Sequence, residues 1–271
     1  MSIQKCLLSL TLLLSVFGCS ASSNWSRPKF ESGGTEARIA YFIPGTYTFP
    51  LVMSRSKHRT EGPPPGVKIV EGHREKDLKD WDELFTGFVT RDFEKRDKLT
   101  FEKVKVAPNA ITLFGETDDT KSLEYLRNSI GVVQAALDAG GIAVYDLEGY
   151  RWYTPSEWKE KFFEPDKPKI QDQIYLLVNP NDDDPSLFYA HTQGMRKFGR
   201  ADLALKNVRE NEFPAIENFL FSNSDDQMRG KVIKDGAKLK IHELGKELTF
   251  KFIDGDNDPL FNNKYLEASV R

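Results

Sequence analysis

The sequence predicts an α+β fold: a mainly antiparallel sheet with helices packed on it. Two observations favour this class. Some β-like runs are separated only by a short polar turn, as at 174–178 and 187–190, which is typical of antiparallel neighbours. Helical patterns are interspersed among the runs without alternating regularly with them, unlike a doubly wound parallel sheet. The folded body is expected over 37–271, as one domain or as two subdomains.

The first half of the body contains β-like segments, which are either apolar runs or alternations of apolar and polar residues. These segments are 38–43, 67–70, 101–106, 110–114 and 142–145. A polar, basic loop is expected over 54–66, where three consecutive prolines stiffen its end. The segment 74–85 predicts a short charged helix with Leu78, Trp81 and Phe85 on its inner face.

The most regular pattern predicts a helix over 123–137. Its apolar residues recur every three or four positions and therefore share one face. They are Leu123, Leu126, Ile130, Val133 and Leu137. Gly140 and Gly141 end the helix. With the β-like runs on either side, the pattern predicts a strand–helix–strand unit at about 110–146.

A second helix is expected to begin at Thr154, because Pro155 suits a first turn and Glu157 stands three residues after the cap. A short aromatic helix is expected over 213–221. The other β-like runs are 174–178, 187–190, 203–208, 238–242 and 248–253, the last two forming a hairpin.

Composition limits the function classes. The chain has 38 basic and 41 acidic residues, a formal net charge of −3, so no nucleic-acid partner is expected. Both cysteines, Cys6 and Cys19, precede the body, which therefore has no disulfide, thiolate metal site or cysteine nucleophile. Hydrophobic residues at 39% and aromatic residues at 12% are sufficient for a packed core.

The N-terminus has the three parts of an export signal: Lys5, an apolar run over 6–17, and small residues after it. The run is too short to cross a bilayer as a helix, which needs about 20 apolar residues. Residues 16–19, Val-Phe-Gly-Cys, resemble the lipobox of bacterial lipoproteins. The alternative is an ordinary secreted protein with a chance cysteine at this place.

The lipobox resemblance implies cleavage after Gly18, a diacylglycerol on the Cys19 thiol, and acylation of the new amine, for instance by palmitate. The chain then divides into a lipoprotein signal peptide (1–18), a lipidated flexible tether (19–36) rich in serine and glycine, and the body. The implied location is the cell envelope, where the lipid attaches the protein to a membrane. Ser20, in place of an aspartate, favours the outer membrane of a two-membrane bacterium.

The densest group of candidate functional residues is His191, Arg196, Arg200 and Asp202. His191 could act as a general base, and Asp202 could orient it or pair with an arginine. The two arginines could hold a carboxylate or a phosphate. We favour the alternative, in which these side chains stabilise the loop by salt bridges.

Two acidic turns, 182–184 and 254–258, are reminiscent of calcium loops. The second has Pro259 where an EF-hand loop needs glycine and Tyr265 where it needs glutamate, and the first contains no glycine. Both are therefore interpreted as solvated turns, and no metal or other cofactor is expected.

Two segments of the body resemble an uncharacterised bacterial class of domains of unknown function. In 135–145 the resemblance is carried by a helix–strand pattern, AALxxGGxAVY, and in 191–208 by a loop pattern, HTxGMxxFGxxDL. This resemblance implies an α+β fold and no known activity.

Three hypotheses of function follow. The leading one is a membrane-anchored lipoprotein whose non-enzymatic body binds an envelope protein or another envelope ligand; an immunity or inhibitor lipoprotein is a special case. The alternative is an envelope hydrolase or transferase that uses the 191–202 loop. It requires a cleft that contains His191.

Overall fold

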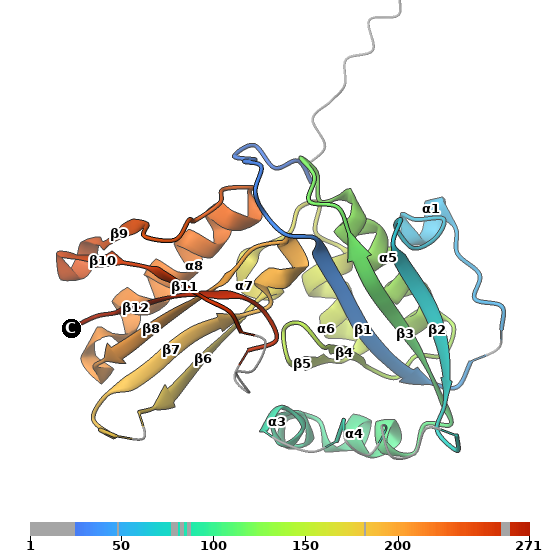
Figure 1. The fold of residues 1–271 in the computed structure, drawn as a ribbon. Helices are drawn as coiled ribbons and strands as arrows, with labels where there is room; N and C mark the ends of the chain where they lie inside the picture. The colour runs from blue at the N-terminus through green and yellow to red at the C-terminus, as the bar shows by residue number, and fades with distance from the viewer. Residues whose placement is uncertain are drawn as a thin grey trace, which may run out of the picture.

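A computed structural model of the chain describes residues 25–47, 49–76, 81, 84–85, 88–181, 183–255 and 261–271. Helices and strands are mixed, and the strands form two five-stranded sheets and one two-stranded sheet (Figure 1). Most strand pairs are antiparallel, which confirms the α+β class. Among the described residues, no helix is both long enough and apolar enough to cross a bilayer.

The first sheet is centred on β1 (Ala37–Gly45), which pairs antiparallel with a strand on each side. In spatial order its strands are β2 (Val67–His73), β3 (Asn109–Thr117), β1, β4 (Val144–Asp146) and β5 (Arg151–Tyr153). The strands predicted at 38–43, 67–70, 110–114 and 142–145 belong to this sheet. Only β5 was not predicted.

The predicted strand–helix–strand unit is confirmed as β3, α5 (Glu124–Asp138) and β4. All five residues predicted to face inward are buried. Both strands lie antiparallel to β1, on opposite sides of it, so α5 crosses over β1 to connect them. Gly140 then adopts a positive φ of 122°, a conformation that suits glycine at the end of a helix.

The prediction of a strand at 101–106 is wrong, because this segment belongs to helix α4 (Lys98–Lys105). The Asp97 side chain caps the helix by accepting from the Thr100 amide. Phe101 and Val104, three residues apart, are buried, whereas Val106 is 69% exposed. A short alternation of apolar and basic residues also fits a helical spacing, and here the cap favours the helix. α4 and α3 (Phe88–Arg96) pack on the face of the first sheet opposite α5.

Two other predicted segments of the first half differ in detail. The loop at 54–66 contains a short helix, α1 (Arg55–His58), which is capped by Ser54. Of the helix predicted over 74–85, only residues 74–76, 81 and 84–85 are described, so Leu78 lies outside the described residues.

The helix expected at Thr154 forms as α6 (Pro155–Trp158), with both hydrogen bonds of the capping box. It continues as a π-helical turn, Lys159–Phe163, and the short α7 (Ile170–Gln173) follows.

The second sheet has one parallel pair, β12 with β8, among antiparallel ones. In spatial order its strands are β11 (Lys251–Ile253), β12 (Tyr265–Ser269), β8 (Asp202–Val208), β7 (Phe188–Gln193) and β6 (Tyr175–Pro180). The long helix α8 (Phe213–Met228) packs on it and extends past the predicted 213–221. The predicted hairpin forms between β9 (Lys238–Ile241) and β10 (Lys246–Thr249), whereas 251–253 joins the second sheet.

Residues 25–36 differ from the flexible tether expected over 19–36, because they are packed on the body. Trp25 and Arg27 are buried. Backbone amides of this segment donate to carbonyls of the body, including Lys29 to Arg229 (2.9 Å) and Thr35 to Gly199 (3.1 Å). Serine and glycine make up 7 of the 18 residues over 19–36, but the side chains of Trp25 and Arg27 pack on the body. The signal peptide, Gly18, Cys19 and the rest of the tether lie outside the described residues.

The Arg27 side chain makes most of this attachment. Its guanidinium donates to the carbonyl oxygens of Met228 (3.0 Å), Phe198 (3.1 Å) and Gln227 (3.1 Å). It also forms an ion pair with Asp119, at 2.5 Å. A buried guanidinium with this many partners connects elements far apart in the sequence.

Replacing Arg27 with methionine is expected to lower the free energy of unfolding by about 3–5 kcal/mol, because the carbonyl acceptors lose their donor. Urea unfolding monitored by tryptophan fluorescence measures this loss. The matched control is Lys29→Met, which removes a partly exposed ion pair with Asp226 and costs less than about 1 kcal/mol. Equal losses in the two variants would contradict the role given to Arg27.

Candidate functional site

The structure places His191 inside the protein. His191 lies on β7 and is fully buried, with its ring centroid 4.6 Å from that of Phe261 and 5.5 Å from that of Tyr189. A general base needs contact with its substrate, and this position gives His191 no solvent-accessible surface.

Asp202, at the start of β8, is buried as well. One carboxylate oxygen accepts from the Thr192 hydroxyl (3.0 Å) and the Met195 amide (3.2 Å), and the other accepts from the Asn263 side chain (2.8 Å). Burial raises the pKa of Asp202 to about 7, against the effect of these hydrogen bonds. Asp202 therefore holds together the two ends of the β7–β8 connection.

The two predicted arginines point to different places. Arg200 is buried and pairs with Asp119 at 2.8 Å, and it donates to the Gly230 carbonyl at 2.8 Å. Arg196 lies nearer the surface, where it pairs with Glu116 at 3.2 Å and donates to the Asn262 carbonyl at 2.7 Å. The structure does not gather the four predicted residues around one cavity, and this arrangement favours the structural interpretation of the loop.

Sequence reasoning missed one fully buried charge of this connection, Lys197. Its ammonium group forms an ion pair with Asp146 at 2.5 Å, and both side chains are fully buried. The remaining Asp146 oxygen accepts from the amides of Glu148 and Gly149. The partners are 51 residues apart, so no local pattern in the sequence could pair them.

We call the three ion pairs Arg196–Glu116, Lys197–Asp146 and Arg200–Asp119 the joint. All three cations come from the connection between β7 and β8 of the second sheet. The three acids come from the first sheet or from the turn that follows one of its strands: Glu116 lies on β3, Asp119 follows β3, and Asp146 ends β4. The polar group that the sequence singles out therefore connects the two sheets.

Glu148 lies beside the joint and is almost completely buried. One of its oxygens is 3.1 Å from Nε of Arg38. Burial raises the pKa of Glu148 to about 7, although the Arg38 and Arg196 guanidinium groups oppose this rise.

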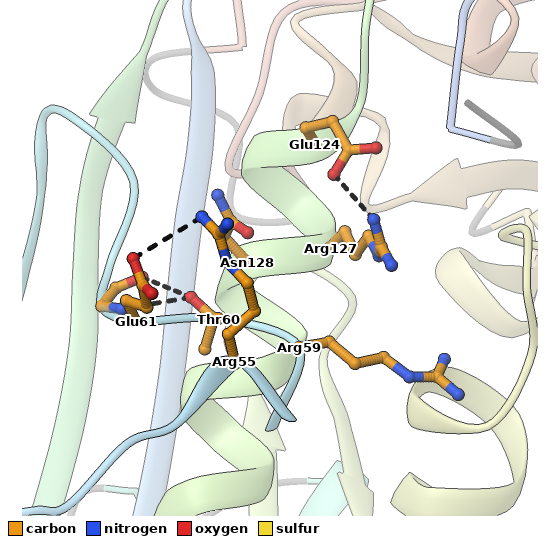
Figure 2. Close-up of a pocket in the computed structure, with 8 residues that line it drawn as sticks. Arg55, Arg59, Thr60, Glu61, Glu124, Arg127 and Asn128 are labelled. Carbon is orange, nitrogen blue, oxygen red and sulfur yellow. Dashed lines mark hydrogen bonds and ion pairs between the residues drawn. The ribbon is translucent and has the colours of Figure 1, made fainter. Parts of the chain in front are cut away.

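A polar pocket of about 530 Å³ lies elsewhere, between α1 with its following loop and the first turns of α5 (Figure 2). Three arginines line this arginine pocket together with other polar residues. Its lining is Arg55, Arg59, Thr60, Glu61, Gly62, Glu124, Arg127 and Asn128. Gly131 lets the two walls approach closely, since a Cβ there would lie 2.2 Å from the His58 carbonyl oxygen.

The three guanidinium groups are held in different ways. Figure 2 shows Arg55 extending toward Glu61, at 3.5 Å, with Arg59 directed away from both. Arg59 donates to the Phe163 carbonyl at 2.8 Å and lies over the ring of that residue. Arg127 pairs with Glu124, one turn earlier on α5, at 3.2 Å.

The chemistry of the arginine pocket suits an anion. Planar guanidinium groups bind carboxylates and phosphates through paired hydrogen bonds. Both glutamate partners are at least 39% exposed, and ion pairs of this kind contribute little, so a bound anion can replace them. The three cations exceed the two carboxylates, and the volume lies within the range of small-molecule sites.

The two acidic turns are only partly described. Asp184 accepts from the amide and hydroxyl of Ser186, as in an ordinary polar turn, while Asp182 lies outside the described residues. In the second turn only residues 254 and 255 are described. Within the described part of the chain, no group of three or more His, Cys, Asp or Glu side chains converges on a possible metal position.

No protein-family model, no curated protein and no solved structure matches the chain. The joint and the arginine pocket are therefore interpreted from their own geometry.

The free energy of unfolding is expected to depend on pH through Glu148. Because its pKa is about 7 in the folded state and near 4.5 when unfolded, the folded state binds the extra proton between these values. Stability should therefore fall as pH rises from about 4.5 to about 7, by up to about 3 kcal/mol from this group.

Glu148→Gln should remove this contribution, so that the variant gains stability relative to the unmodified protein as the pH rises. Urea unfolding at a series of pH values tests it, with Glu102→Gln at an exposed position of α4 as the control. A parallel pH dependence of Glu148→Gln and the unmodified protein would contradict the assignment. The raised pKa of Asp202 also makes the free energy of unfolding fall as pH rises, and this contribution is present in both the variant and the unmodified protein.

Proposed function

We propose that the chain is a lipid-anchored protein of the cell envelope whose body binds a ligand or partner there without transforming it. The anchor is supported by the lipobox-like residues 16–19 after an apolar run that is too short to span a bilayer. Ser20 supports the outer membrane in a host that has two membranes.

The arginine pocket is the observation that carries the binding function. It is open to solvent and lined by polar side chains, among them three arginines and two glutamates. A ligand with a phosphate or carboxylate group fits this lining best, whether the group belongs to a small molecule or to a side chain of a partner protein.

A hydrolase or transferase that uses the 191–202 loop is not proposed. That alternative requires His191 in a cleft, and His191 lies buried between aromatic rings. The Asp202 carboxylate accepts hydrogen bonds from Thr192, Met195 and Asn263, which is the arrangement of a structural side chain.

Cys19→Ser is expected to abolish the lipid anchor, because the thiol is the attachment point. The protein should move from the membrane fraction to the soluble fraction and lose label from radioactive palmitate. Cys6→Ser is the matched control, since it removes the other cysteine within the apolar run and leaves the attachment point intact. A Cys19→Ser protein that keeps the label would exclude the proposed anchor.

Anion binding in the arginine pocket should be detectable with pyrophosphate as the probe. At a concentration about 100 times the dissociation constant, binding should stabilise the fold by about 2.7 kcal/mol and raise Tm by several degrees. The double variant Arg55→Gln/Arg127→Gln should lose this shift.

The control for this experiment is Arg91→Gln, an exposed arginine on α3 outside the pocket. It should keep the full shift. If the control and the double variant lose the shift together, pyrophosphate binds through general charge and the pocket has no special role.

A further inference from the structure

The packed N-terminal segment shortens the connection between the proposed lipid and the body. Trp25 and Arg27 are buried, so only residues 20–24 separate the anchored Cys19 from the first fixed residue. The six residue steps from Cys19 to Trp25 span at most roughly 20 Å even when fully extended. The point where the chain joins the body must therefore stay within that distance of the lipid.

Basic side chains surround this point on both sides. The Arg27 amide donates to the Lys121 carbonyl, and the Lys29 amide donates to the Arg229 carbonyl, both at 2.9 Å. Next to them is a groove of about 390 Å³, whose lining includes Ser26, Lys167, Lys169 and Arg229. We call Ser26, Lys121, Lys167, Lys169 and Arg229 the attachment surface.

The attachment surface has a local positive charge in a chain whose formal net charge is −3. Its four basic residues are all exposed. Asp225 lines the same groove, and burial raises its pKa. The exposed Asp166 adjoins Lys167 in the sequence. Of the residues that line the groove, three are basic and one is acidic.

Asp226, also on this side, is already engaged. It pairs with Lys29 at 2.5 Å and lies 3.9 Å from the Lys231 ammonium group. Its charge is therefore compensated by cations outside the attachment surface.

We propose that the attachment surface lies against the bilayer and that its basic side chains contact the phosphates of anionic lipid headgroups. The inference rests on the proposed lipid anchor. Basic side chains attract anionic headgroups over about one Debye length, roughly 8 Å at physiological salt. The short connection brings these four within reach, and it leaves α3 and α4 at the far end of the molecule, opposite the blue N-terminal segment (Figure 1).

Fluorescence quenching by lipid headgroups tests this orientation. The lipidated protein, cleaved after Gly18, is reconstituted in vesicles of phosphatidylcholine, with or without phosphatidylglycerol, that contain a headgroup-attached nitroxide. The body has no cysteine, so Gln171→Cys and Val106→Cys each provide a single labelling site. Gln171 lines the groove, and Val106 is exposed at the end of α4.

The label at 171 should be quenched, and more strongly when phosphatidylglycerol is present, whereas the label at 106 should remain unquenched. The triple variant Lys167→Glu/Lys169→Glu/Arg229→Glu should lose the dependence on phosphatidylglycerol. The control Lys95→Glu/Lys98→Glu/Lys103→Glu makes the same charge change on α3 and α4 and should keep it. Thermal unfolding confirms that each triple variant remains folded.

Equal quenching at 171 and 106, or an equal loss in both triple variants, would overturn the inference. Flotation of the same vesicles separates this failure from that of the anchor. A protein that does not float with the vesicles contradicts the proposed function itself. A protein that floats without preferential quenching at 171 contradicts only the proposed orientation.

Discussion

The arrangement of the two sheets depends on the joint, in which three cations of the β7–β8 connection meet three acids at or after the ends of β3 and β4. The central pair, Lys197 with Asp146, has no contact with water. A buried charge is tolerated only when its partners are complete, and Asp146 reaches this state through Lys197 and two backbone amides. Removing either partner leaves an uncompensated charge between the sheets, so the pair specifies their relative position.

The glycines of the same connection have a packing role. Gly199 has a positive φ of 61°, and a Cβ there would lie 2.2 Å from the Thr35 carbonyl oxygen. The N-terminal segment can therefore pass directly over the turn. The glycines and charged residues over 191–203 are therefore explained by close backbone approach and by buried polar partners. A catalytic site would select the same types of residue.

The parts of the fold that were predictable from the sequence are those in which local pattern and burial agree. The spacing of five apolar residues identified α5, and the capping chemistry at Thr154 identified the start of α6. The prediction of a strand at 101–106 was wrong because the alternation of apolar and basic residues there is too short to distinguish the period of a strand from that of a helix. β12 was missed, and its parallel partner β8 lies some 60 residues earlier in the chain.

The candidate site was predictable in location but not in role. Local density of polar residues pointed to 191–202, and the structure does give Asp202, Arg196 and Arg200 defined partners. The ion-pair partners of the two arginines, Glu116 and Asp119, lie about 80 residues away, so no local pattern in a single sequence could identify them. The arginine pocket was overlooked because its basic residues come from two separate segments, each with the composition of an ordinary surface.

The attachment of Arg27 has a mechanical consequence for a protein held by its N-terminus. Tension on the proposed lipid would not pull first on β1, whose residues begin only at Ala37. It would reach Arg27, and pass through Asp119 to Arg200 and through the Phe198 carbonyl to the β7–β8 turn. Both sheets would then bear the force, which would be spread over several hydrogen bonds and ion pairs. No single strand would be separated from the edge of its sheet first.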